Sequence, residues 1–284
     1  MTSDTTSPPS TVFRAAGDLR LLTWPALDAS GAGAAVTARA GGVSSGPYES
    51  LNLSLSVGDD PGCVLENRHR LAAAFGAAPG DFVFARQVHG AGVAVVAGAD
   101  RGSGTQSLDD AIGGTDALVT TSPEVVLAIL TADCVPIVLH DSVAGVLACV
   151  HAGWRGTVAG VAAATLAAMQ GLGTRPSDVV AGIGPAVGAD RYQVGPDVHQ
   201  AVTRSFGPAA AQFIRSDPSA PGRWLLDLQA ANRHALRQAG VPGARIHAAG
   251  IPTGPVPGHF FSDRAARPCG RLALAARLRP GGER

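Results

Sequence analysis

The segment from residue 125 to residue 157 constrains the fold more than any other part of the chain. Three apolar runs, at 125–130, 135–140 and 144–150, each have the length of a strand, and short polar turns separate them. The turn between the first two runs contains Asp133 and Cys134, and the third run ends at His151. A carboxylate, a thiol and an imidazole therefore stand at the ends of buried strands, where a rigid scaffold presents reactive side chains.

The other predicted elements follow one another in mixed order. Asp60 and Pro61 predict the start of a helix, since Asp is a good N-cap and Pro suits the first helical position. Strand patterns occur at 81–88, 93–96 and 272–278. Because this is no regular alternation of strand and helix, we expect an α+β fold with mixed β-sheets in a single domain. We expect a disordered tail over residues 1–16 and the catalytic domain over 17–284.

Composition excludes several classes of protein. The chain has 22 basic and 22 acidic residues, so its net charge is zero, and no basic stripe predicts nucleic-acid binding. The longest apolar stretch, 125–139, is interrupted by polar residues, so no membrane span is expected. The first ten residues lack the features of a signal peptide. The four cysteines show no disulfide pattern, which favours a reducing, cytoplasmic location.

His89, Cys134 and His151 each follow an apolar run, and this placement permits two readings. Two imidazoles and one thiolate suit Zn²⁺ with one position left open for water. Alternatively, Cys134 is a nucleophile, a histidine is its base and Asp133 orients that base. The same ligands also suit copper, although the sequence lacks the many histidines of a multicopper oxidase. Ordinary core packing of all three residues is the plainest alternative.

Arginines near glycine-rich turns are candidates for anion binding. Arg155 lies in Gly153-Trp154-Arg155-Gly156, at the start of a predicted helix whose N–H groups would favour an anion. Arg39 and Arg264 are further candidate substrate contacts, and a purely structural role is an equally good reading for each. No P-loop or GxGxxG pattern is present in the sequence.

Eleven short motifs together resemble the YfiH-like family, also called the laccase-domain, multicopper polyphenol oxidase or peptidoglycan editing factor family. The most specific are LTADCVP at 130–136 and HAGWRGT at 151–157, together with QVHG at 87–90, ENR at 66–68 and TDALVT at 115–120. The resemblance extends over roughly residues 20 to 278. It departs from the family pattern in FFSDRAARPCG at 260–270, where the usual tyrosine and second arginine are missing.

The resemblance implies an α+β fold in which helices sandwich the mixed sheets, and a zinc site on His89, Cys134 and His151. It also implies a purine nucleoside phosphorylase that acts on adenosine, inosine, guanosine or methylthioadenosine with phosphate, and that deaminates adenosine. On this reading Asp133 is a candidate proton-transfer group in catalysis, and Arg155 and Arg39 are candidates for holding phosphate.

Two other enzymatic functions stay open within the same resemblance. One is a copper-dependent polyphenol oxidase, and the other is an amidohydrolase that edits a cell-wall precursor, with Cys134 as a candidate catalytic group. A binding protein with a structural zinc is a non-enzymatic alternative. The sequence leaves open whether the protein is a monomer or a homodimer.

Overall fold

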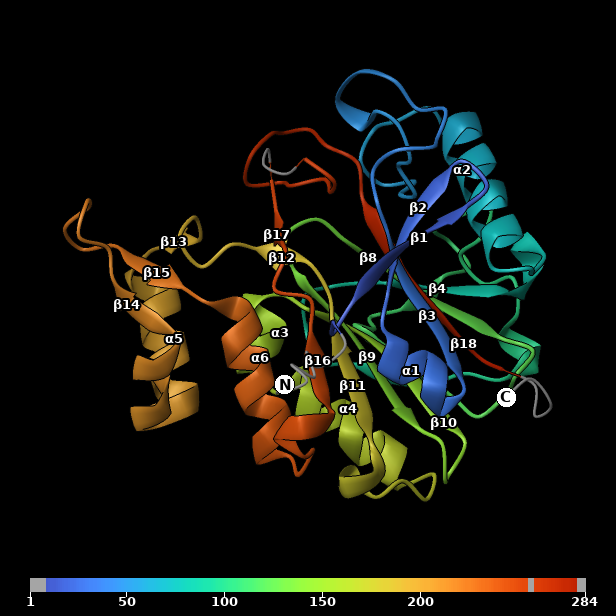
Figure 1. Ribbon diagram of the computed structural model, residues 1–284. Coiled ribbons are helices and arrows are strands. Elements are labelled where there is room, and N and C mark those ends of the chain that lie inside the picture. Colours follow the sequence, from blue (N-terminus) through green and yellow to red (C-terminus); the bar gives the residue numbers. More distant parts are fainter. Residues whose placement is uncertain (1–8, 255–257, 280–284) are drawn as a thin grey trace, which may run out of the picture.

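The computed structural model describes residues 9–254 and 258–279, and its two large sheets organise the whole molecule (Figure 1). The first sheet has, in spatial order, β1 (Val12–Ala16), β2 (Leu19–Thr23), β3 (Ala32–Thr37), β18 (Leu272–Leu278), β8 (Val126–Thr131), β4 (Phe82–Arg86) and β6 (Ile112–Gly113). The second has β16 (Ile246–Ala248), β11 (Val180–Ile183), β9 (Val135–Asp141), β10 (Val146–Ala152), β7 (Ala117–Thr120) and β5 (Val93–Val95). Both contain parallel and antiparallel pairs.

Among the described residues, two smaller sheets and six α-helices complete the fold. The small sheets are β12 (Ala186–Val187) with β17 (Pro252–Thr253), and β13 (Gln193–Val194), β15 (Trp224–Leu226) and β14 (Ile214–Ser216). The helices are α1 (Pro25–Ser30), α2 (Pro61–Ala74), α3 (Trp154–Val158), α4 (Val161–Gln170), α5 (Pro196–Phe206) and α6 (Leu228–Gln238). Short 3₁₀ turns lie at Gly46–Tyr48, Pro79–Asp81, Gly98–Asp100, Pro176–Asp178, Gly207–Gln212 and Gly243–Arg245.

Side-chain alternation on the central strands explains their long apolar runs. On β8, Leu127 and Ile129 pack between the two sheets, whereas Val126 and Ala128 pack in the cluster that contains Leu71 of α2. Strands β9 and β10 divide their side chains in the same way between the inter-sheet core and a cluster with α4 and α6. Because helices cover the outer faces, both faces of these strands are buried and nearly every position is apolar. The predicted mixed sheets sandwiched by helices, in one domain, are confirmed.

The three apolar runs of the segment at 125–157 form β8, β9 and β10, but they do not form one meander. β9 and β10 pair as a hairpin, with His151 opposite Pro136. β8 instead pairs with β18 and β4 in the other sheet. The turn that holds Asp133 and Cys134 therefore carries the chain from one sheet to the other, and it lies where the two sheets meet.

Two local expectations need correction or completion. The predicted tail over residues 1–16 was wrong for Val12–Ala16, which form β1 in an antiparallel pair with β2, while residues 1–8 lie outside the described part. The single helix predicted to begin near Arg155 is two helices, α3 and α4, because Gly160 between them adopts φ +82°. Within residues 9–254 and 258–279, no helix is both long and apolar enough to cross a bilayer.

Candidate functional site

Two strand ends and the inter-sheet turn bring His89, Cys134 and His151 together. His89 lies three residues beyond the end of β4, Cys134 lies between β8 and β9, and His151 belongs to β10. One ligand atom from each lies within 4.8 Å of the others. His151 is buried, Cys134 is half-buried and His89 is exposed, so the cluster is open to solvent on the His89 side.

Unusual backbone conformations place these ligands. Within the described residues, His89 (φ 59°) and Asp133 (φ 84°) are the only non-glycine residues in the left-handed region. Such conformations cost free energy and persist at functional sites where the surroundings enforce them. Gly153, the N-cap residue of α3, lies against the cluster, and a Cβ atom there would lie 2.9 Å from Cys134 Sγ. Only glycine therefore fits at this position without displacing the thiol.

Asp116 forms hydrogen bonds with two of the three candidate ligand residues. Its carboxylate is fully buried and accepts a hydrogen bond from His151 Nδ1 at 2.9 Å. It also accepts hydrogen bonds from the backbone N–H groups of His89 at 2.9 Å and Gly90 at 2.6 Å. The imidazole of His151 is thereby oriented with Nε2 free for a ligand. Reasoning from sequence missed this role, although an acidic residue immediately before a buried strand in TDALVT was the available signal.

The electrostatics of the cluster favour a thiolate. Burial by itself raises the pKa of Cys134, but the nearby His151 and His89 outweigh it and hold that pKa below its ordinary value. Burial likewise disfavours a charged His151, but the Cys134 thiolate and the Asp116 carboxylate raise the pKa of that imidazole. A negatively charged sulfur beside two imidazole rings is the protonation state that metal binding requires of a cysteine.

The cluster opens into a cavity of about 600 Å³, which we call the central pocket. Five arginines line it: Arg86, Arg155, Arg264, Arg267 and Arg271. Asp263 forms ion pairs with Arg267 and Arg271, whereas the other three have no carboxylate partner among residues 9–254 and 258–279. The pocket thus has an excess of positive charge in a chain whose net charge is zero.

Arg155 and Arg264, both predicted from sequence, lie in this pocket against aromatic rings. The guanidinium of Arg155 lies 4.4 Å from the ring centroid of Trp154, and that of Arg264 lies 5.2 Å from the ring centroid of Tyr192. The phenol of Tyr192 also lines the pocket, and burial followed by the Cys134 charge raises its pKa to about 12. Tyr192 therefore keeps its proton and can donate a hydrogen bond at neutral pH.

Asp133 lines the pocket but its carboxylate is already engaged. One oxygen accepts a hydrogen bond from Thr253 Oγ1, and the other accepts one from the backbone N–H of Arg264 at 2.6 Å. Asp133 therefore ties the inter-sheet turn to the segment that carries Arg264. This geometry fits a positioning role better than the expected role in proton transfer.

Arg39 lies outside the central pocket, contrary to the expected role in holding phosphate. Its Nε and Nη2 atoms both donate to the carbonyl of Glu49, at 3.0 and 2.7 Å, and its guanidinium stacks over Phe261. These contacts fix the loop between β3 and α2. The structure thus favours the structural reading of Arg39.

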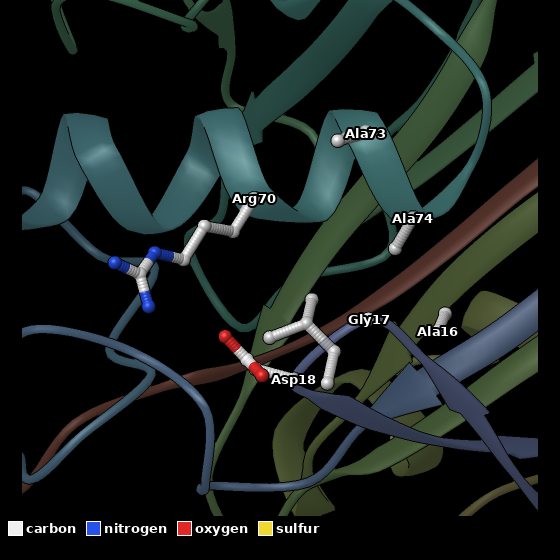
Figure 2. A pocket seen from close by; sticks show the side chains of 7 residues that line it. Ala16, Gly17, Asp18, Arg70, Ala73 and Ala74 are labelled. Carbon is white, nitrogen blue, oxygen red and sulfur yellow. The ribbon is translucent and has the colours of Figure 1, made fainter.

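A second cavity, of about 360 Å³, lies between the β1–β2 turn and α2 (Figure 2). Small residues form most of its wall, and Asp18 and Arg70 reach toward it from opposite sides. Arg70 already pairs with Glu66 and donates to the carbonyl of Gly41. This second cavity shares no lining residue with the central pocket, and no histidine or cysteine lines it. It is therefore separate from the ligand cluster.

Comparison with known proteins places this architecture in a family. Residues 33–279 match the family described as multi-copper polyphenol oxidoreductase laccase. A Geobacillus stearothermophilus protein named purine nucleoside phosphorylase YlmD is 40% identical over 242 residues, which cover 84% of this chain and 86% of that protein. The chain belongs to this laccase family. The resemblance predicted from the motifs is thereby confirmed.

Other proteins resemble this chain in sequence and in structure. A Deinococcus radiodurans protein named purine nucleoside phosphorylase is 45% identical over 207 residues, covering 73% of this chain and 75% of its own. The crystal structure of YlmD from Geobacillus stearothermophilus superposes with a TM-score of 0.90 at 36% identity and covers 96% of this chain and 100% of that one. The Bacillus licheniformis hypothetical protein YfiH has a TM-score of 0.88 at 32% identity, covering 94% and 99%.

The donor set of this laccase-family chain fits one ion. Two imidazole nitrogens and one thiolate suit zinc and also copper. Within the described residues, His89, Cys134 and His151 form the only group of three or more such side chains close enough to share a metal. The methionine at 169 is buried in the core with α4, so it offers no axial ligand here. A multi-copper centre therefore lacks the necessary ligands in this part of the chain.

Proposed function

We propose that this chain is a purine nucleoside phosphorylase that holds a zinc ion on His89, Cys134 and His151. The observation that carries the proposal is a three-donor cluster that opens into a pocket where three of the five arginines have no carboxylate partner among residues 9–254 and 258–279. A nucleoside and inorganic phosphate are the substrates that such a pocket suits. The names of relatives 40% and 45% identical, both called purine nucleoside phosphorylase, support it.

Phosphorolysis transfers the sugar from the purine to phosphate. A phosphate oxygen forms a bond to C1′ as the bond from C1′ to the purine nitrogen breaks, and the electron pair leaves with the purine, which then takes a proton. The arginines Arg155 and Arg264 are placed to bind and orient the phosphate, because each is free of a carboxylate partner among the described residues. The faces of Trp154 and Tyr192 hold these guanidinium groups in position. A zinc ion, when bound, would supply a Lewis acid beside the substrate.

We propose adenosine deamination as a second activity of the same pocket. Three protein donors are the number found in catalytic zinc sites, whereas structural sites usually have four. The exposed side of the cluster, at His89, faces the central pocket, so a purine can approach it. Asp133 is not assigned the proton transfer, since both its oxygens already accept hydrogen bonds.

The test combines metal analysis with product analysis. Purified protein should contain about one zinc per chain, and incubation with inosine and phosphate should release hypoxanthine and ribose 1-phosphate. Adenosine without phosphate should give inosine if the second activity is present. A His89→Ala variant serves as the control, and base release no greater than in this variant would exclude the phosphorylase.

Polyphenol oxidation is the competing function, because the family's description names it. It requires copper and oxygen uptake with a phenolic substrate. Zinc without oxygen uptake would reject it. We also propose a cytoplasmic location, which the four free cysteines support because thiols stay reduced there.

A further inference from the structure

Two loops without regular structure form one part of the central pocket. Ser54 and Ser56 come from the loop before α2, and Leu108 comes from the loop before β6. We call these three residues the loop wall. The hydroxyls of Ser54 and Ser56 lie 2.9 Å apart in a hydrogen bond, and Ser56 is exposed. The wall therefore offers one polar group and one apolar side chain to a molecule in the pocket.

Arg68 of α2 joins the two loops. Its Nε donates to the carbonyl of Leu53 at 2.9 Å, next to Ser54. Its Nη1 donates to the carbonyls of Gly104 at 2.6 Å and Thr105 at 2.9 Å, in the loop that continues to Leu108. The guanidinium also stacks on the ring of Phe84 at 4.1 Å. One side chain thus fixes both loops to the core of the first sheet.

This arrangement is costly for the fold. Arg68 is 4% exposed and has no carboxylate partner among the described residues, and its Nη2 atom is buried without a hydrogen-bond partner. Burial lowers its pKa to about 10. Arginine is almost never fully buried unless it is paired with an opposite charge. We therefore infer that an arginine at position 68 serves a purpose other than the stability of the fold.

The neighbouring Asn67 reinforces the first loop. Its side-chain amide donates to the carbonyls of Ser50 at 3.1 Å and Asn52 at 2.8 Å, and Asn52 in turn bonds both the N–H and the carbonyl of Ser54. The ENR motif at 66–68 thus points two polar side chains at the loops instead of at solvent. Neither side chain contacts the metal ligands, so their contribution is to the shape of the pocket.

We propose that Arg68 is a positioning residue that holds the loop wall where the nucleoside packs, and this inference rests on the proposed phosphorylase function. The guanidinium matters through its geometry, since it reaches three carbonyls on two loops at once. A lysine keeps the charge but concentrates its donors on a single nitrogen. Loosening the wall weakens binding of the nucleoside while the metal cluster and the phosphate-binding arginines keep their places.

The experiment compares Arg68→Lys with Arg277→Lys. Arg277 is a matched control, because its guanidinium also donates to two backbone carbonyls, those of Phe75 and Gly76 at the end of α2, outside the central pocket. For Arg68→Lys we expect KM for inosine to rise about tenfold, with kcat within about twofold and zinc content unchanged. Hydrogen exchange should become faster at residues 50–56 and 103–108 in this variant only.

The outcomes separate this inference from the proposed function. A wild-type KM in Arg68→Lys, or unchanged exchange in both loops, would overturn the role of Arg68. A loss of thermal stability with unchanged KM would mean that Arg68 is structural only. If the wild-type protein does not phosphorolyse inosine, the function fails, and exchange still decides whether Arg68 holds the loops. If Arg68→Lys does not fold, the exposed Ser56 provides a second test. Ser56→Ala should raise KM for inosine about threefold, and an unchanged KM would contradict a contact between the loop wall and the nucleoside.

Discussion

At the scale of single residues, Asp116 shows how a side chain outside the ligand cluster sets the geometry of that cluster. Its carboxylate bonds His151 Nδ1 and the backbone N–H of His89 at the same time. Replacing Asp116 with Asn should weaken zinc binding by about 10- to 100-fold, because such supporting groups orient the ligands. Competition with a chelator measures this. Asp217→Asn is the control and should leave the affinity at the wild-type value, because the Asp217 carboxylate bonds Gln193 and does not line the central pocket.

Gly153 gives a second test at the scale of the residue. A Cβ atom would lie 2.9 Å from Cys134 Sγ and 3.2 Å from His89 Cδ2, so Gly153→Ala must displace a ligand. We expect zinc content per chain to fall well below that of the wild type while the fold persists. Gly80→Ala is the control, since no atom lies within 4 Å of a Cβ there. Full zinc occupancy in Gly153→Ala would contradict this account of the cluster.

Among the elements, helix α2 supports the central pocket, because its Asn67 and Arg68 hold the loops that line the pocket. Its N-cap Asp60 accepts a hydrogen bond from the backbone N–H of Cys63 at 3.0 Å. Asp60→Ala should reduce the free energy of unfolding by about 1 kcal/mol. Urea denaturation measures that loss, and Asp60→Asn, which keeps an acceptor, should recover most of it. KM should stay unchanged in both variants, since the cap lies outside the pocket.

At the scale of the whole molecule, buried His140 contributes to the pH dependence of stability. It is 3% exposed on β9, its Nδ1 bonds Ser30 Oγ, and burial lowers its pKa to about 4. The unfolded chain binds a proton at this residue below about pH 6.5, whereas the folded chain does so only near pH 4. The contribution of His140 to stability is therefore fully present above about pH 6.5 and is lost as the pH decreases toward 4, by at most about 3 kcal/mol.

Urea denaturation of the wild type and of His140→Asn at pH 7 and pH 4.5 isolates this contribution. The variant should lose less stability than the wild type between the two pH values, because an amide takes up no proton. Equal losses in the two proteins would show that His140 does not contribute to the acid sensitivity of the fold.

Local signals in the sequence determined much of this protein. The bounds of β18 at 272–278 and the start of α2 at Asp60 and Pro61 follow from the residues themselves, because strand pattern and N-capping are short-range effects. The position of His89, Cys134 and His151 after apolar runs likewise predicted that they act as a set, and the fold brings them together.

Tertiary structure alone decided what surrounds that set. Asp133 meets Thr253, 120 residues away, and Arg39 meets the carbonyl of Glu49 instead of the pocket. Asp116 lies next to His151 because β7 pairs with β10. These contacts depend on which distant strands pair: β8 joins β18 and β4, and the turn at Cys134 crosses between the sheets. Strand pairing over long separations is set by the packing of both sheets at once, so no local pattern in the sequence encodes it.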